Sequence, residues 1–328
     1  MNGLLATLRD IAATYWWVID LLLVATGLII YVGASHSLHQ RRHPAAAISW
    51  VLGIVLLPYI TLPLYLAFGS RKIVAAKHAA GRHRVAASTG QTHATAARVQ
   101  QLGVAMGVPD PVAYENLTVH EDGTQALNAL RATIDGAEET IEVATFLVGR
   151  DVLGDEIAER LKQRAREGVR VRLLIDGIGI YIGGYPDMKS LKAAGVEVLR
   201  FVPPFRSPKR GRTNLRNHRK MVIADGRHLW CGGRNLAAEY FEGDPRPILR
   251  RRAWLDLSFD LAGEIAGQAR QQFEEDWAFA SEQAPPEASK KAGDGSAPLA
   301  LAQLVPSGPD RTDDTIHIML ISGCFTSQ

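Results

Sequence analysis

Residues 217–235 read NHRKMVIADGRHLWCGGRN. The apolar, β-prone run that follows Lys220 predicts a strand over residues 218–224. The pair Asp225-Gly226 predicts a tight turn, and residues His228 to Cys231 are expected to form the returning strand of a hairpin.

Side chains alternate between the two faces of a strand, so His218 and Lys220 are expected on one face and Arg219 on the other. An imidazole that acts as a nucleophile or base and a cation two residues away can both reach one phosphate group. This pairing is the chemistry that the H-x-K-x4-D spacing from His218 to Asp225 allows.

Around this stretch, strand-like segments alternate with amphipathic helix-like segments. Strands are expected over residues 117–120, 140–148, 169–175, 196–201 and 254–261. Helices are expected over residues 123–136, 151–167 and 263–277, with a short one that ends at Gly195. Strands that alternate with helices imply an α/β layered domain over residues 116–280, with a mixed, largely parallel sheet flanked by helices.

Two apolar segments precede this domain. Tyr15–Val32 is apolar except for Asp20, and Ala45–Phe68 has 24 residues without a charge. About 20 apolar residues span a bilayer, so the sequence predicts a hairpin of two transmembrane helices, over 15–32 and 45–68. A signal peptide is disfavoured for the first segment because no basic region precedes it. Pro58 and Pro63 leave a buried core helix or a re-entrant segment as alternatives for the second.

Basic residues flank the two predicted spans unevenly. The turn between them carries Arg41 and Arg42, and the segment after the second span carries Arg71, Lys72, Lys77, Arg82 and Arg84. The larger group is expected to stay in the cytoplasm, together with the C-terminal domain and the N-terminus. The two arginines of the turn argue against this orientation.

Acidic residues are missing from two stretches. Leu21–Pro109 contains eight Lys or Arg residues and Phe205–Lys220 contains seven, and neither stretch has an Asp or Glu. Such a local excess indicates an anionic partner: a membrane surface, a phospholipid headgroup or nucleic acid. The two cysteines, Cys231 and Cys324, are too few for a disulfide framework or a zinc cluster.

Composition also predicts the domain boundaries. A membrane hairpin at 1–70 is followed by a basic linker at 71–115, which reads as a linker or a soft helix. The α/β domain at 116–280 is followed by a Pro/Ala/Ser-rich linker at 281–300. The remaining residues, 301–328, are too few for a domain and read as the opening of one.

The opening stretch matches the HxKxxxxD…G[GS]xN motif of the phospholipase D superfamily, at His218, Lys220, Asp225, Gly232, Gly233 and Asn235. Several segments resemble the bacterial cardiolipin synthases of that superfamily: RRHPAAAISWVLGIVLLPYITLPLYLAFG, EGVRVRLLIDGIG, AAGVEVLRFVPP, RNHRKMVIADG, Trp254 with Asp256, and FEEDW. The likeness extends over residues 15–310 and implies a phospholipase D-like fold behind an N-terminal membrane hairpin.

The sequence departs from that family in two places. Family members carry two copies of the motif, with the active site between the two halves, and this sequence has one. LVPSGPDRTDD near the end resembles the start of a second half, so we expect a truncated second half at 301–328. The insert DPRPILRRR before Trp254 is longer and more basic than the family pattern.

The resemblance implies that His218 attacks a phosphodiester phosphorus and forms a phosphohistidine, without a metal or cofactor. Lys220 and Asn235 would hold the phosphate oxygens. Other substrate contacts are expected from Gly232, Gly233, Arg216 and Arg219.

Two carboxylates receive different roles. Asp225 is roughly 20 Å from His218 along an extended strand, so it is expected to fix the turn. Asp256, or failing that Glu239, is expected to orient the His218 imidazole.

A second histidine must protonate the leaving alkoxide and then activate the incoming alcohol. His120, His228 and His317 are available, but none has a Lys two residues further on. The monomer is therefore expected to have little activity, and single-motif members of the superfamily work as dimers.

The function that we expect is phosphatidyl transfer between two phosphatidylglycerol molecules, which gives cardiolipin and glycerol. The expected partners are phosphatidylglycerol, anionic membrane lipid and a second copy of the chain, but not nucleic acid, because of the membrane hairpin. The expected location is the bacterial inner membrane, with a multi-pass anchor and a cytoplasmic catalytic domain. The alternatives are a phospholipase D-type hydrolase that is active only as a dimer and a non-catalytic, membrane-anchored half-enzyme.

Overall fold

The computed structural model describes residues 2–37, 44–69, 94–183, 186–203, 216–242, 254–284, 300–308 and 315–326. Most of the predicted basic loop, the basic insert and the 281–300 linker lie outside these residues. The described part divides into two compact units. One unit contains the three N-terminal helices, and the other contains the predicted α/β domain.

Seven strands form one mixed sheet in the second unit. Their order is β2 (Glu115–His120), β8 (Ser258–Ala262), β7 (His228–Gly232), β6 (Met221–Ala224), β3 (Thr140–Thr145), β4 (Arg170–Asp176) and β5 (Glu197–Phe201). Neighbours among β3, β4 and β5 are parallel, and every other neighbouring pair is antiparallel.

The prediction of an α/β domain with a mixed sheet is confirmed, but the prediction that the sheet is largely parallel is wrong. Parallel neighbours need a crossover, usually helical. Such crossovers join only β3, β4 and β5, through α6 (Val152–Arg166), α7 (Gly179–Gly183) and α8 (Met188–Ala193). The turn after β6 instead reverses the chain into β7, which makes that part of the sheet antiparallel.

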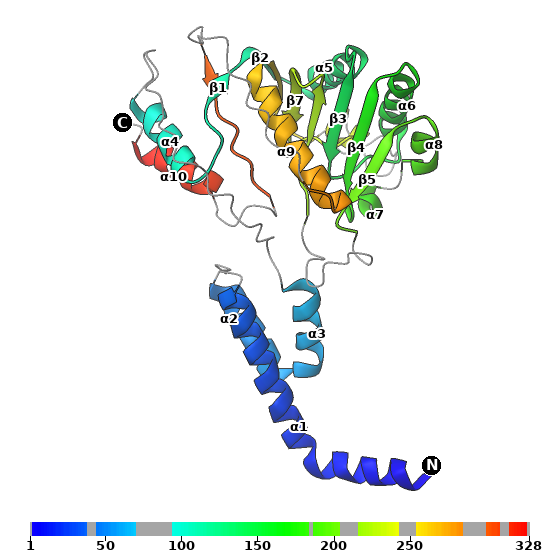
Figure 1. The fold of residues 1–328 in the computed structure, drawn as a ribbon, viewed down its shortest axis with the longest axis vertical. Helices are drawn as coiled ribbons and strands as arrows, with labels where there is room; N and C mark the ends of the chain where they lie inside the picture. The colour runs from blue at the N-terminus through cyan, green and yellow to red at the C-terminus, as the bar shows by residue number, and fades with distance from the viewer. Residues whose placement is uncertain are drawn as a thin grey trace. The chain divides into compact units, whose positions relative to one another are not determined.

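Helices cover both faces of the sheet (Figure 1). α5 (Gly123–Asp135) and α6 pack on the face where Ile141 and Val143 enter the main apolar core. α9 (Glu264–Ser281) lies on the other face. There, Glu142 accepts a hydrogen bond from Arg172, which also donates to Glu274 of α9. Side chains alternate along β3, so the buried charge of Glu142 faces α9 while Ile141 and Val143 face the apolar core.

Helices α5 and α6 start at side-chain caps. Asp122 accepts a hydrogen bond from the backbone N–H of Gln125, and Asp151 accepts one from that of Gly154, both at 2.8 Å. Such caps satisfy N–H groups that the first helical turn leaves open. After α6, Gly168 takes the left-handed conformation, with φ at +97°, that ends many helices. The structure confirms both predicted helices.

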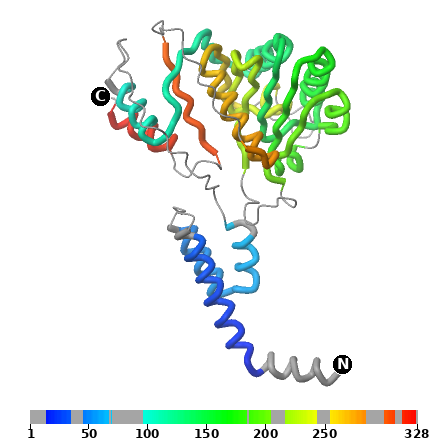
Figure 2. Tube along the Cα trace, in the orientation of Figure 1, coloured from blue at the N-terminus to red at the C-terminus, as the bar shows by residue number. Residues whose placement is uncertain are grey.

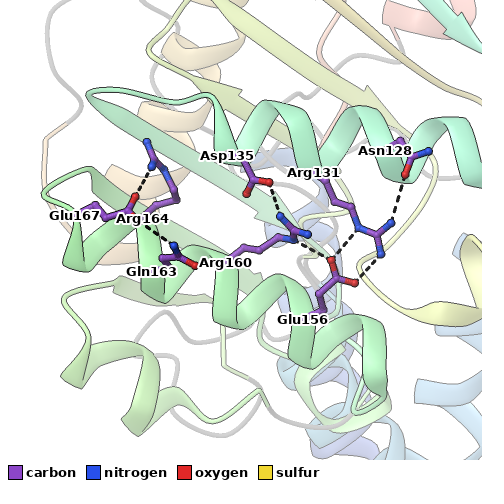
Figure 3. A network of polar contacts seen from close by, with 8 residues as sticks. All are labelled: Asn128, Arg131, Asp135, Glu156, Arg160, Gln163, Arg164 and Glu167. Carbon is purple, nitrogen blue, oxygen red and sulfur yellow. Dashed lines mark hydrogen bonds and ion pairs between the residues drawn. The ribbon is translucent and has the colours of Figure 1, made fainter.

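An ion-pair network joins α5 to α6 (Figure 3). Glu156 accepts hydrogen bonds from Arg131 Nε and Nη2 at 2.8 and 2.6 Å, and from Arg160 Nε at 2.8 Å. Arg160 also pairs with Asp135 of α5. The hydrogen bonds from Arg131 are the main cause of the lowered pKa of Glu156. The network therefore links the two helices that cover this face of the sheet.

The other unit contains α1 (Asn2–Ser37), α2 (Pro44–Leu56) and α3 (Pro58–Phe68). α1 is kinked at Tyr15. Among the described residues, Thr14–Ala34 is the one stretch of helix that is long and apolar enough to cross a membrane. The prediction of a second spanning helix over 45–68 is not confirmed, because the chain breaks at Leu57, where Pro58 has no N–H for a continuing helix.

Parts of the predicted 71–115 linker and of the C-terminal tail pack together. α4 (Ala94–Ala105) lies beside α10 (Thr315–Thr326), and β1 (Val112–Ala113) pairs antiparallel with β9 (Leu301–Ala302) (Figure 1 and Figure 2). Met319 of α10 is buried and approaches Gly103 of α4. Residues 94–113 are thus ordered elements of the sheet-containing unit, rather than linker throughout.

Candidate active site

The register of the sheet brings the ends of β3 and β7 and the starts of β6 and β8 to one edge. Met221 at the start of β6 is paired with Ala144 near the end of β3 and with Cys231 near the end of β7. The last residue of β7, Gly232, is paired with Ser258 at the start of β8. The β6 ladder begins at Met221, so His218 and Lys220 precede the strand. The sequence predicted instead that they would be its first residues.

His218 and Lys220 both contact Phe146, which follows β3. The rings of His218 and Phe146 have centroids 5.1 Å apart, and Lys220 Nζ lies 5.7 Å from the Phe146 centroid. Lys220 Nζ also donates a hydrogen bond to the backbone carbonyl of His218 at 2.9 Å. The imidazole is exposed, whereas the lysine is buried. The structure therefore brings an accessible imidazole and a buried cation together at one ring.

The surroundings favour the neutral form of both side chains. Partial desolvation of the accessible imidazole, followed by the charge of Lys220, lowers the pKa of His218 below 6.5, although Asp176 partly opposes this. Burial lowers the pKa of Lys220 to about 8, against the attraction of Asp256 and Asp176. At neutral pH, His218 therefore has a free nitrogen lone pair, and Lys220 still carries its charge.

Asp176, at the end of β4, is a site residue that sequence reasoning missed. Its fully buried carboxylate accepts hydrogen bonds from the backbone N–H groups of Asn217 and Ile178, both at 2.8 Å, and contacts Arg216 Nη1 at 3.3 Å. Burial raises the pKa of Asp176, although these donors oppose the rise. An aspartate at the carboxyl end of a buried parallel strand was the available signal, because ligands bind beyond such strand ends in α/β folds.

Asp256 lies close to Gly233. Its charge acts on Lys220 and Tyr240, and its Oδ1 accepts a hydrogen bond from the N–H of Leu257 at 2.7 Å. The carboxylate whose charge acts on His218 is Asp176. The orientation of the imidazole by Asp256, or failing that by Glu239, stays a prediction.

A second buried carboxylate, Asp276 of α9, holds both neighbours of His218 in the chain. It accepts a hydrogen bond from Asn217 Nδ2 at 2.8 Å and from Arg219 Nη1 at 2.7 Å. Arg219 therefore points to α9, on the face opposite to His218 and Lys220 that the strand alternation predicted. Its ion pair with Asp276 anchors the segment around the imidazole, and its expected contact with substrate stays a prediction.

Asn235 is buried near the same edge. Its side chain hydrogen-bonds the hydroxyl of Tyr240, which ends the short 3-10 helix η1 (Ala238–Tyr240). Its Oδ1 is buried and has no hydrogen-bond partner among the described residues. A buried polar atom without a partner is costly, so this side chain has capacity for a further contact.

Gly232 and Gly233 make room for the start of β8. A Cβ on Gly232 would lie 2.4 Å from the carbonyl oxygen of Leu257, and one on Gly233 would lie 2.1 Å from Asp256 Oδ1. A side chain at either position would force its neighbours to shift. The structure thus gives these glycines a packing role, and their expected contact with substrate stays a prediction.

Arg216 remains a candidate for an anion contact. Its Nη1 donates to the carbonyl oxygen of Val202 at 2.9 Å and contacts Asp176, while its Nε and Nη2 are buried without a hydrogen-bond partner in the described part of the chain. No three His, Cys, Asp or Glu side chains of that part come together as a metal site would.

Asp225 lies at the other end of β6. Its carboxylate accepts hydrogen bonds from the backbone N–H groups of Glu138, Glu139 and Thr140, at 2.9, 2.7 and 2.9 Å. Burial acts to raise the pKa of Asp225, but these N–H groups outweigh it and lower the pKa. The carboxylate therefore ties the β6–β7 turn to the start of β3, away from His218.

The other histidines do not approach His218 within the sheet. His228 is paired with Ala224, at the end of β6 opposite to the site. His120 is on β2, three strands from β6, or about 14 Å at about 4.8 Å per strand. Its Nε2 lies 2.6 Å from Asp260 Oδ1, though not in good hydrogen-bond alignment. His317 is on α10, outside the sheet.

Comparison with known proteins gives a consistent result. Residues 130–277 match the family model described as "Cardiolipin synthase, PLD-like domain". The chain is 30% identical over 329 residues to cardiolipin synthase A of Pseudomonas aeruginosa (strain LESB58), covering 95% of this chain and 66% of that protein. It is 28% identical to cardiolipin synthase A of Pseudomonas putida (strain W619), over 92% of this chain and 64% of that one. The chain thus spans slightly less than two thirds of the length of these curated relatives.

Solved structures with similar folds include NucT from Helicobacter pylori, with a TM-score of 0.35, 17% identity, and coverage of 50% of this chain and 96% of that one. Phosphatidylserine synthase from Haemophilus influenzae Rd KW20 gives a TM-score of 0.42 and 12% identity, over 69% of this chain and 47% of that one. On the family match and the curated relatives, residues 130–277 of this chain form a PLD-like domain of the cardiolipin synthase type.

Proposed function

We propose that this protein is a cardiolipin synthase-like phosphatidyltransferase, which converts two phosphatidylglycerol molecules to cardiolipin and glycerol. The observation that carries the proposal is the exposed, neutral imidazole of His218 beside the buried cation of Lys220. A neutral imidazole can attack phosphorus, and a cation that is shielded from water stabilises the negative charge that develops on the phosphate oxygens.

In the first step, the His218 lone pair forms a bond to the phosphorus of phosphatidylglycerol, and the bond to the glycerol oxygen breaks. Glycerol leaves after it takes up a proton, and the phosphatidyl group stays on the imidazole. Lys220, Asn235 and Arg216 hold the phosphate oxygens. The buried Nε and Nη2 donors of Arg216 have no partner among the described residues, which suits Arg216 to that contact, whereas Asn235 would donate from its Nδ2 because its unpartnered Oδ1 is an acceptor.

In the second step, a hydroxyl of another phosphatidylglycerol attacks the phosphohistidine, loses its proton to a base, and yields cardiolipin and free His218. Both steps need a second acid–base group beside the phosphate. Of the described histidines, His120 and His228 lie on other strands or at the other end of the sheet. We therefore infer that a second copy of the chain completes the site as a homodimer.

The proposed location is the bacterial inner membrane, with the catalytic domain in the cytoplasm. The apolar stretch Thr14–Ala34 of α1 would serve as the anchor, and basic segments follow it. Phosphatidylglycerol is anionic, which suits a chain with long stretches that lack acidic residues.

The direct test is to reconstitute the full chain in vesicles that contain phosphatidylglycerol and to measure cardiolipin and glycerol by mass spectrometry. His218→Ala should abolish product, and a phosphatidyl adduct should be detectable on His218 in the wild type. His228→Ala is a matched control, because that histidine lies at the opposite end of the sheet and should leave activity unchanged.

Three results would contradict the transfer reaction. Phosphatidic acid as the main product would make the chain a hydrolase of the same superfamily. Product that persists in His218→Ala would remove the nucleophile from this site. No product from a demonstrably folded dimer would favour a non-catalytic, membrane-anchored role.

A further inference from the structure

The region predicted as the second membrane span forms two short helices joined at Leu57. α2 has 13 residues and α3 has 11, so they are about 20 and 16 Å long. The hydrocarbon core of a bilayer is about 30 Å thick, so neither helix alone can cross it. Leu57 is non-helical, with φ −140° and ψ 59°, and Pro58 begins the next helix.

The two helices fold back on each other as an antiparallel pair. A Cβ on Gly53 of α2 would lie 2.8 Å from Cγ2 of Thr61 on α3. Further from the break, the rings of Trp50 and Tyr65 have centroids 5.3 Å apart. From one contact to the next, the residue number falls on α2 and rises on α3, so the two helices are antiparallel. The start of α2 and the end of α3 therefore lie on the same side of the pair.

The helix pair packs against part of the candidate span in α1. Gly27 of α1 approaches Ile54 of α2, and the rings of Tyr31 and Tyr65 have centroids 5.4 Å apart. Leu57 is seven residues beyond Trp50, which places the break about 10 Å deeper than the aromatic cluster Tyr31–Trp50–Tyr65. Along α1, by contrast, the distance from Tyr31 to Tyr15 is about 24 Å. Tyr59, beside the break, reaches Asp20, which is about 17 Å from Tyr31 along α1, so the pair ends before the far end of the candidate span.

The outer surface of the pair suits acyl chains. Its exposed side chains include Leu52, Val55, Leu56, Leu57 and Ile60, each with 45–71% of its surface accessible. No charged residue occurs in α2 or α3. The one ionisable side chain inside the apolar part of α1, Asp20, hydrogen-bonds the hydroxyl of Tyr59 beside the break. Such pairing lowers the cost of an ionisable group at membrane depth.

The distribution of basic residues supports the same arrangement. In a two-span hairpin, Arg41 and Arg42 would lie on the side opposite to the basic segment that contains Arg71 and Lys72, against the positive-inside tendency. If α2 and α3 enter and leave on one side, all of these residues lie on the same side. The conflict between the two basic groups then disappears.

We propose that α2–α3 is a re-entrant hairpin that enters and leaves a lipid bilayer on the same side, so that the N-terminal unit crosses the membrane once, through α1. This inference rests on the proposed membrane location. It places the segments on either side of α2–α3 on the cytoplasmic face and residue 2 on the opposite face.

Cysteine accessibility in the full chain tests this topology. In a Cys231→Ala, Cys324→Ser background, single Ser37→Cys, Ser70→Cys and Asn2→Cys variants are treated with a membrane-impermeant maleimide. Labelling is compared between bacterial spheroplasts and inverted membrane vesicles. The two serine positions are matched, because each substitution exchanges one oxygen for sulfur. Both should be labelled in inverted vesicles and protected in spheroplasts, and position 2 should show the reverse.

Labelling of positions 37 and 70 from opposite faces would overturn the re-entrant hairpin and restore two full spans, without affecting the proposed membrane enzyme. Release of the unlabelled chain from membranes by alkaline carbonate would overturn the proposed membrane location, and the hairpin inference with it. The two failures are therefore distinguishable.

Discussion

The pKa values of His218 and Lys220 are lowered by the same environment, mainly by desolvation. The two side chains need opposite protonation states, because the nucleophile must be neutral and the phosphate-binding group must be charged. The interval between their pKa values is therefore the working range of the site.

We expect a bell-shaped dependence of kcat/KM on pH. Activity should rise through the pKa of His218, below 6.5, as the imidazole loses its proton. It should fall through the pKa of Lys220, about 8, as the ammonium loses its charge. In Lys220→Arg the alkaline limb should move well above this range, because a guanidinium stays charged. An alkaline limb that is identical in Lys220→Arg would show that Lys220 does not cause it.

Asp276 acts through residues 217 and 219 and is therefore a positioning residue. In Asp276→Asn, the charged hydrogen bonds to Asn217 and Arg219 are weakened, and the imidazole loses its fixed placement. We expect kcat to fall about 100-fold, because small displacements of a reacting group have effects of this size, while KM changes little. Glu275→Gln, on the same helix, is the matched control. A proportional rise in KM without loss of kcat would contradict positioning.

At the scale of secondary-structure elements, one carboxylate connects the β6–β7 turn to β3. Asp225 has φ at +54°, a conformation that Asn also tolerates, and its carboxylate accepts three backbone N–H groups. The aspartate of the family motif thus organises the sheet at the end opposite to the imidazole.

Asp225→Ala should lower the free energy of unfolding by about 2 kcal/mol, because three backbone N–H groups lose their acceptor. Asp225→Asn, which keeps one acceptor oxygen, should lose less, and the activity per folded molecule should stay near wild type in both. The pKa of Asp225 is lowered in the folded state. Its stabilisation is therefore present above the unfolded-state pKa and is lost as pH falls through the folded-state value. Urea denaturation at neutral and acid pH measures both effects, and loss of activity without loss of stability would refute this role.

Membrane insertion also depends on whole elements. Pro58 and the Gly53–Thr61 contact divide an apolar run that is long enough to span a bilayer into two short helices. Hydropathy alone does not register this break, because both helices are as apolar as a continuous span.

At the scale of the whole molecule, the proposed active site needs two copies of the chain. In a symmetric dimer, each subunit contributes the same surface, so the His218 of one copy would be the nucleophile and that of the other the acid. Equal amounts of wild-type and His218→Ala chains, mixed and allowed to exchange, should then retain about one quarter of the wild-type activity, because only wild-type pairs are complete. Retention of half of the activity would show that each chain works alone. His228→Ala chains, mixed in the same way, should cause no loss.

The amino-acid sequence by itself determined the local structure and one face of the candidate site, the face that His218 and Lys220 share. Strand and helix periodicity and the helix caps are local signals, so the main helices and the β6–β7 hairpin were predictable from it. His218 and Lys220 are two residues apart, so their shared side followed from backbone geometry. Asp225 was predicted to fix a turn for the same reason.

The tertiary structure alone decided what surrounds that face. Asp176 and Asp276 meet Asn217 from 41 and 59 residues away in the sequence, and no spacing rule predicts such contacts. The contacts of Arg219, Asp256 and the two glycines depend on the pairing of β7 with β8 and on the packing of α9, which local sequence does not encode. Likewise, the turn of α2–α3 against part of the α1 span depends on side-chain packing between helices, which hydropathy does not encode.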